Sequence, residues 1–200
     1  MADAGRVIAG SARGIRLAAP GSGTRPLGDR VKQTLFAVLE PDLPGARVLD
    51  LFAGSGAAGI EALSRGAATA VFVERDPAAA RVIEANLART RLAAGARVVR
   101  ADAIAYLADP VAVAGGAFDV VLLDPPYAEP DLLVRALERL GDPAAGLLEP
   151  DARVVAKHFW RAGPPARVGL LASERERRYG ETALTFYRAA PPVHREVEAG

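Results

Sequence analysis

The feature that most constrains this chain is a repeated alternation between apolar strands and helices. Residues 47–52 (RVLDLF) predict a buried strand, the glycine-rich turn AGSG follows, and residues 57–65 predict a helix that ends at Gly66. Four such strand–helix units run consecutively. Nearly continuous apolar strands form parallel sheets with helices on both faces, so an α/β fold is predicted. The further strands are predicted at residues 69–74, 96–101, 118–123 and 153–158, and the further helices at residues 77–92, 103–108 and 131–140.

The C-terminal part of the chain departs from this alternation. Residues 170–179 and 183–188 flank Gly180-Glu181 and predict an antiparallel hairpin. Added to the five earlier strands, this hairpin gives a seven-stranded, mostly parallel sheet with an antiparallel C-terminal edge.

The N-terminal part carries its own short elements. Residues 6–9 and 15–18 predict a small hairpin around Arg13-Gly14, and a helix is predicted from Asp29, its cap, to Leu39. We therefore expect three parts. They are an N-terminal basic arm of hairpin and helix packed on the main domain (1–46), the main domain (47–190) and a frayed tail (191–200).

Composition excludes several classes of site. There is no cysteine and there are only two histidines, His158 and His194, so disulfides, thiolate metal sites and cysteine nucleophiles are excluded and no metal site is predicted. The apolar runs are far shorter than the roughly 20 residues that cross a bilayer, and the first ten residues hold no apolar signal region. We expect a soluble, cytoplasmic monomer without a membrane partner.

Charge is unevenly distributed although the net charge is only +1. Residues 1–39 carry six basic side chains against two acidic ones, whereas the middle of the chain is acidic. Such a basic arm indicates contact with a polyanion, with ordinary surface charge as the alternative.

Three carboxylates follow neighbouring strands and predict a nucleoside-binding rim. Asp50 precedes the turn that holds Gly54 and Gly56, Glu74 ends the second strand, and Asp102 ends the third. The carboxyl ends of parallel strands are the usual ligand site, where Glu74 can accept ribose hydroxyls and Asp102 can accept an adenine amine. The pattern also matches GxGxxG of NAD-binding proteins, but an acid before the turn suits the amino-acid end of S-adenosylmethionine better than a pyrophosphate.

The segment Asp124-Pro125-Pro126-Tyr127 follows the fourth strand and indicates the chemistry. Two prolines make a rigid exit that presents two acceptors, the Asp124 carboxylate and the Pro125 carbonyl, with Tyr127 beside them. Two acceptors can bind both N–H groups of a nucleobase amine and free its lone pair for attack on a sulfonium methyl. Tyr127 can stack on a base taken out of its helix.

These residues resemble a known family. The motifs DLFAGSG and DPPY resemble class I S-adenosylmethionine-dependent amino-methyltransferases, which have a Rossmann-like fold. The segments RVIAGSARGIRL, RPLGDRVKQTLF, DLFAGSGAAGIEALSR and GETALTFY narrow the resemblance to RsmD, the bacterial 16S rRNA guanine-N2 methyltransferases that act on guanine 966. The resemblance spans about residues 6–188. It departs from the family pattern at Leu27, Gly28 and Gln33, where the family commonly has two threonines and an acid.

The resemblance implies S-adenosyl-L-methionine as cofactor and 16S rRNA, within the small subunit or its assembly intermediate, as partner. It implies that Asp124, Pro125, Pro126 and Tyr127 are the catalytic residues. The implied cofactor-binding residues are Asp50, Phe52, Ala53, Gly54, Ser55, Gly56, Glu74, Arg75, Asp102 and Ala103. The implied RNA-binding residues are Arg6, Arg13, Arg16, Arg25, Arg30 and Lys32.

Alternatives stay open at this point. A DNA adenine-N6 methyltransferase can use the same DPPY segment, although residues 1–46 leave little room for a target-recognition domain. An NAD-dependent oxidoreductase and a non-catalytic RNA-binding assembly factor are the others. Lys157, His158, Trp160 and Arg161 could form a second basic and aromatic contact, or pack at the strand end. Arg175, Arg177 and Arg178 alternate with Glu174 and Glu176, which is typical of a solvated hairpin face.

Overall fold

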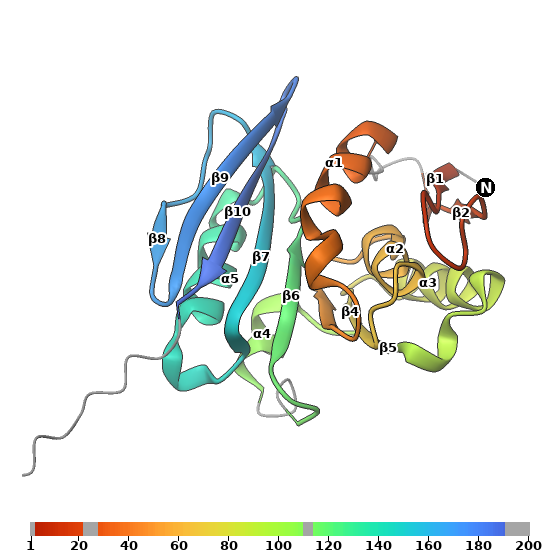
Figure 1. The fold of residues 1–200 in the computed structure, drawn as a ribbon, viewed down its shortest axis with the longest axis horizontal. Helices are drawn as coiled ribbons and strands as arrows, with labels where there is room; N and C mark the ends of the chain where they lie inside the picture. Colours follow the sequence, from red (N-terminus) through yellow and green to blue (C-terminus); the bar gives the residue numbers. More distant parts are fainter. Residues whose placement is uncertain (1–2, 22–27, 110–113, 191–200) are drawn as a thin grey trace, which may run out of the picture.

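The computed structural model describes residues 3–21, 28–109 and 114–190. Its centre is an eight-stranded mixed sheet (Figure 1). In spatial order its strands are β5 (Ala96–Val99), β4 (Thr69–Val73), β3 (Arg47–Asp50), β6 (Phe118–Leu123), β7 (Leu148–Phe159), β10 (Thr182–Ala189), β9 (Leu171–Tyr179) and β8 (Arg167–Val168).

The predicted sheet is confirmed. The first five strands in this order pair in parallel, and β10, β9 and β8 are antiparallel. Seven of the strands are the predicted ones, and the eighth, β8, has only two residues. Because the chain runs from β3 outward to β5 and then returns to β6, the order reverses between β3 and β6, the position where such sheets bind ligands.

Helices cover both faces of the sheet (Figure 1). Leu35, Ile60 and Ile83 of the first three helices belong to one core cluster, and Leu107 and Leu137 of the last two belong to the other. The sheet therefore buries both faces, as its apolar strands require. The helices are α1 (Asp29–Leu39), α2 (Ala57–Ser64), α3 (Pro77–Thr90), α4 (Ala103–Ala108) and α5 (Pro130–Gly141), and short 3-10 turns lie at Glu40–Asp42, Ala93–Gly95 and Pro143–Ala145.

Helix starts follow the sequence in one case and depart from it in another. Asp76 caps α3 by accepting from the Ala78 N–H at 2.9 Å, with Pro77 as the first helical residue, as predicted. The prediction that Asp29 caps α1 is wrong, because Asp29 is the first helical residue and Gly28 occupies the cap with extended backbone.

The N-terminal hairpin lies earlier than predicted. Strand β1 (Asp3–Arg6) pairs with β2 (Arg16–Ala18), whereas residues 6–9 were expected as the first strand. The backbone N–H groups of Ile8 and Ala9 donate instead to the Glu61 carboxylate of α2, at 2.7 and 3.0 Å. These donors are therefore satisfied across the fold rather than by a strand partner.

The tail call, residues 191–200, lies outside the described residues. In the part of the chain that the structure describes, no helix has the length and apolar character that crossing a membrane needs.

Candidate active site

A cavity of about 640 Å³ opens at the carboxyl ends of β3, β4, β6 and β7. Of the fourteen residues predicted for cofactor binding and catalysis, thirteen line it, and Gly56 does not. The fold thus brings together side chains that are up to 77 residues apart in sequence, from Asp50 to Tyr127. Its walls also include residues that were not predicted, among them Ala19, Leu132 and Lys157.

The glycine turn after β3 explains why Gly56 is absent from the wall. Gly54 and Gly56 both have left-handed backbone, with φ of 54° and 76°. A Cβ on Gly54 would meet nothing within 4 Å, so this glycine leaves open space at the cavity, whereas a Cβ on Gly56 would lie 3.0 Å from the Ile83 side chain. Gly56 serves instead as the cap of α2, packed against α3.

Asp50 is the most deeply buried carboxylate of the site, with 3% of its surface exposed. Its Oδ2 accepts from the Gly59 N–H at 2.9 Å. Burial raises the pKa of Asp50 to about 7, opposed by the Gly59 hydrogen bond, and the neighbouring Asp124 and Glu74 carboxylates raise it further. Such a carboxyl gains most from a cationic partner such as an ammonium group.

Glu74 and Asp102 form the rest of the acidic rim. Glu74 accepts from the Gly54 N–H at 2.8 Å and from the Asp76 N–H at 2.8 Å, so its carboxylate ties the glycine turn to the start of α3. Asp102 caps α4 through Oδ1 alone, accepting from Ile104 and Ala105. Both remain part of the cavity wall with lone pairs for hydroxyl or amino donors.

The DPPY segment forms the opposite wall of the cavity. Asp124 Oδ1 accepts from the Lys157 Nζ of β7 at 2.6 Å. The ammonium also lies 5.4 Å from the centre of the Tyr127 ring, and the Tyr127 hydroxyl is 2.9 Å from the Thr182 Oγ1 of β10. Tyr127 is 43% exposed, the one exposed large apolar side chain among the described residues. A flat aromatic surface at a cavity mouth is suited to stacking on a base.

Lys157 is the functional candidate that the sequence placed wrongly. It was grouped with Trp160 and Arg161 as a surface contact, but only 14% of its side chain is exposed and it lines the cavity. Burial raises the pKa of Asp124 and the Lys157 ammonium opposes that rise. The strand register carries a signal, since Leu123 lies opposite Ala156, which brings the next residues, Asp124 and Lys157, together.

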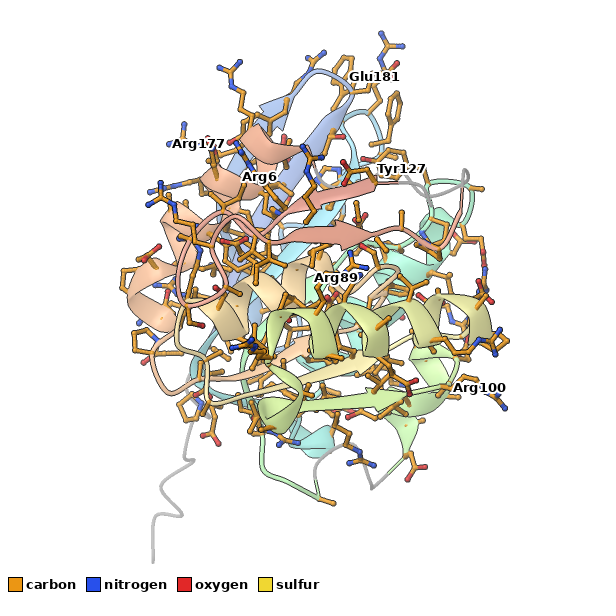
Figure 2. The ribbon with its side chains drawn as sticks, turned by 90° about the vertical axis from the view of Figure 1, so that its right-hand side faces the viewer. Arg6, Arg89, Arg100, Tyr127, Arg177 and Glu181 are labelled. Atoms are coloured by element: carbon orange, nitrogen blue, oxygen red, sulfur yellow. The ribbon has the colours of Figure 1, made fainter. Side chains whose placement is uncertain are left out.

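The predicted RNA-binding residues have different positions. Arg6, Arg13, Arg16 and Arg30 are exposed, and Arg16 pairs with Asp3 at 2.8 Å. Figure 2 shows Arg6 at the same end of the molecule as Tyr127. Arg25 lies outside the described residues. The prediction for Lys32 is wrong, because its side chain is 1% exposed and its ammonium donates to the Arg6 carbonyl and lies 3.8 Å from Glu61, so it cannot reach a phosphate.

The sheet order, the glycine turn after β3 and the DPPY wall after β6 define a class I methyltransferase. Solved structures agree. The Escherichia coli protein yhhF, described as a methyltransferase, superposes with a TM-score of 0.81 at 36% identity, covering 92% of this chain and 97% of that one. A Haemophilus influenzae protein described as a methylase has a TM-score of 0.79 at 30% identity, covering 95% and 100%.

The sequence narrows this class to one family. Residues 5–188 match the family described as Conserved hypothetical protein 95. The Bacillus subtilis relative YlbH, described as an rRNA methyltransferase, is 42% identical over 92% of this chain and 98% of its own length. Ribosomal RNA small subunit methyltransferase D of Escherichia coli K12 is 39% identical over 92% of this chain and 89% of its own. The chain belongs to this family, the RsmD family, as its motifs predicted.

Proposed function

We propose that this protein transfers a methyl group from S-adenosylmethionine to the exocyclic N2 amine of one guanine, of the guanine 966 type, in small-subunit rRNA. The observation that carries the proposal is the cavity in which the acidic rim and the DPPY wall face each other. One wall suits a nucleoside and the other suits a planar base with an amino group. The relatives YlbH and methyltransferase D, by their names, act on rRNA.

S-adenosylmethionine, when bound, supplies an electrophilic sulfonium methyl group. The residues present fit it. Asp50 would hold the methionine end beside the open space at Gly54, Glu74 would accept from the ribose hydroxyls, and Asp102 would accept from the adenine amine. The remaining wall residues, Phe52, Ala53, Ser55, Arg75 and Ala103, would complete the cofactor side.

On the target side, the chain acts by positioning and electrostatics. The Asp124 carboxylate and the Pro125 carbonyl accept the two N–H groups of the guanine amine, so that its lone pair no longer delocalises into the ring. Tyr127 stacks on the base that has left its helix. The proton is lost after the nitrogen has gained its methyl group, so no strong base is required.

The proposed partner is 16S rRNA within the small subunit or its assembly intermediate, bound by a monomer in the cytoplasm. Arg6, Arg13, Arg16 and Arg30, which are exposed, would bind its phosphates. Phosphate contacts position a nucleic acid and do not choose the base, so the choice of guanine rests with the DPPY side.

The test uses the purified protein, labelled S-adenosylmethionine and small subunits from a strain that lacks the corresponding methylase. We expect N2-methylguanosine at a single position when the digested rRNA is analysed by mass spectrometry. N6-methyladenine in DNA incubated in parallel, with no rRNA product, would identify a DNA methyltransferase instead. Binding of subunits without turnover would identify an assembly factor.

The Asp124→Ala variant tests the role of the DPPY wall. We expect a loss of about 100-fold or more in methyl transfer, since an acceptor aimed at the reacting amine is removed, with S-adenosylhomocysteine binding retained. The matched control is Asp131→Ala, an exposed carboxylate at the start of α5 that does not line the cavity. Full methylation by Asp124→Ala would overturn the assignment.

A further inference from the structure

Two arginines gather over one tryptophan beside the tip of the β9–β10 hairpin. The Arg178 guanidinium lies 3.5 Å, and the Arg161 guanidinium 4.6 Å, from the centre of the Trp160 ring. Trp160 is fastened to the hairpin, since its backbone N–H donates to the Glu181 carbonyl at 3.1 Å. We call Trp160, Arg161 and Arg178 the Trp160 cluster.

The charges of this cluster are not neutralised within the described part of the chain. Arg178 Nε donates to the Gly180 carbonyl at 3.0 Å, which leaves its two terminal nitrogens as donors, and no described carboxylate forms an ion pair with Arg161 or Arg178. The glutamates of β9 are engaged elsewhere. Glu174 pairs with Arg153, and Glu176 accepts from Thr185 at 3.3 Å. The alternating charges of the hairpin therefore do not cancel.

The Trp160 cluster adjoins the cavity mouth. Thr182, which bonds to Tyr127, lies opposite Phe159, the residue before Trp160. Figure 1 shows the hairpin tip extending beyond the ends of the neighbouring strands, and Figure 2 shows Glu181 of that tip and Tyr127 at the same end of the molecule. A polymer whose base stacks on Tyr127 would therefore pass close to the cluster.

We infer that the Trp160 cluster binds the phosphate backbone of the substrate RNA next to the nucleotide that enters the cavity. The inference rests on the proposed function, which makes RNA the partner. The guanidinium is a weakly hydrated fork of donors that matches phosphate geometry. The tryptophan ring holds both guanidinium groups in place by cation–π attraction, which lowers the entropy lost when a phosphate binds. The cluster would act with the N-terminal arginines as a second anchor.

The test compares two double variants with the same change in charge. Arg161→Gln/Arg178→Gln removes the cluster's donors, and Arg135→Gln/Arg139→Gln removes two exposed arginines of α5 that do not line the cavity. Binding of each to small ribosomal subunits is measured over a salt series. For the cluster variant we expect Kd to rise about tenfold or more at low salt, and the slope of log Kd against log salt to fall by about 1.4, or about 0.7 per lost contact on a single strand. S-adenosylhomocysteine binding is measured to check that both variants keep their cavity.

A third variant separates the ring from the charges. Trp160→Leu keeps both arginines but removes the surface that orders them, so we expect weaker subunit binding with an almost unchanged salt slope. If Arg161→Gln/Arg178→Gln binds subunits like the α5 control, the inference is overturned while methylation by the wild type leaves the proposed function intact. If the wild type transfers no methyl group but its subunit binding depends on the cluster, the proposed function fails and the RNA contact stands.

Discussion

At the scale of single residues, the pairing of Lys157 with Asp124 matters most for chemistry. Only the ionised carboxylate accepts both from the lysine and from a target amine, and burial works against ionisation. A lysine 2.6 Å away is the described group that opposes this effect. Lys157 is therefore a positioning residue for Asp124 rather than a proton carrier.

Replacing Lys157 by methionine should shift the pH dependence of methyl transfer. The Asp124 pKa is already raised, and loss of the ammonium removes what holds it down, so the carboxyl takes up its proton at a higher pH. We expect the acidic limb of the rate profile to move to higher pH, with the largest loss of rate at acidic pH. Single-turnover rates across pH 5 to 9 measure this.

The conservative variant provides the control for this prediction. Lys157→Arg keeps the positive charge beside Asp124 and should restore most of the wild-type profile. A uniform loss of rate at all pH values in Lys157→Met would show that the lysine acts only as packing.

At the scale of elements, Glu61 joins the N-terminal hairpin to α2. Its side chain is fully buried, and it pairs with Arg65 at 2.8 Å in addition to accepting from Ile8 and Ala9. The buried Lys32 ammonium lies 3.8 Å away. Removing this one carboxylate would leave two backbone donors and a buried cation without their partner.

We expect Glu61→Ala to lower the free energy of unfolding by about 3–5 kcal/mol, the usual cost of breaking a buried ion pair. Urea unfolding measures it, and limited proteolysis should show faster cleavage within residues 3–21. Glu84→Ala, an exposed glutamate of α3, is the matched control and should change stability by less than about 0.5 kcal/mol. Equal stability of the two variants would show that the arm is held by its apolar contacts alone.

At the scale of the whole molecule, the cavity joins the ends of four strands that run through both core clusters. A ligand bound there stabilises the entire sheet, because these strands cannot unfold without losing it. With S-adenosylhomocysteine at 100 times its Kd, the gain is about 2.7 kcal/mol, which corresponds to a rise in Tm of roughly 5–10 °C for a chain of this size. Thermal unfolding with and without ligand measures this.

NAD is the control ligand for the thermal experiment. Its pyrophosphate would meet the buried Asp50 and the Glu74 carboxylate beside the glycine turn, so we expect no shift in Tm. A shift with NAD and none with S-adenosylhomocysteine would favour the oxidoreductase alternative.

Much of the fold was predictable because it is encoded locally. The bounds of β6 and α4 match the predicted residues 118–123 and 103–108, and α3 begins at Pro77 after its Asp76 cap. Apolar periodicity, a cap or a rigid proline pair acts over a few residues, so a short window of sequence carries it. The meeting of Asp50, Glu74, Asp102 and Asp124 in one cavity also followed, because parallel strands end at the same edge.

What only the tertiary structure decided are contacts between residues far apart in the chain. Glu61 meets Ile8 across 53 residues and Lys157 meets Asp124 across 33. Sequence alone predicts that a lysine is exposed, as it did for Lys32, because burying a charge is costly without a partner. Whether a partner exists depends on which elements pack together, and here the carboxylates of Glu61 and Asp124 are those partners. The sequence thus determined the elements and the motifs, and packing determined which charges serve the interior, the cavity and the surface.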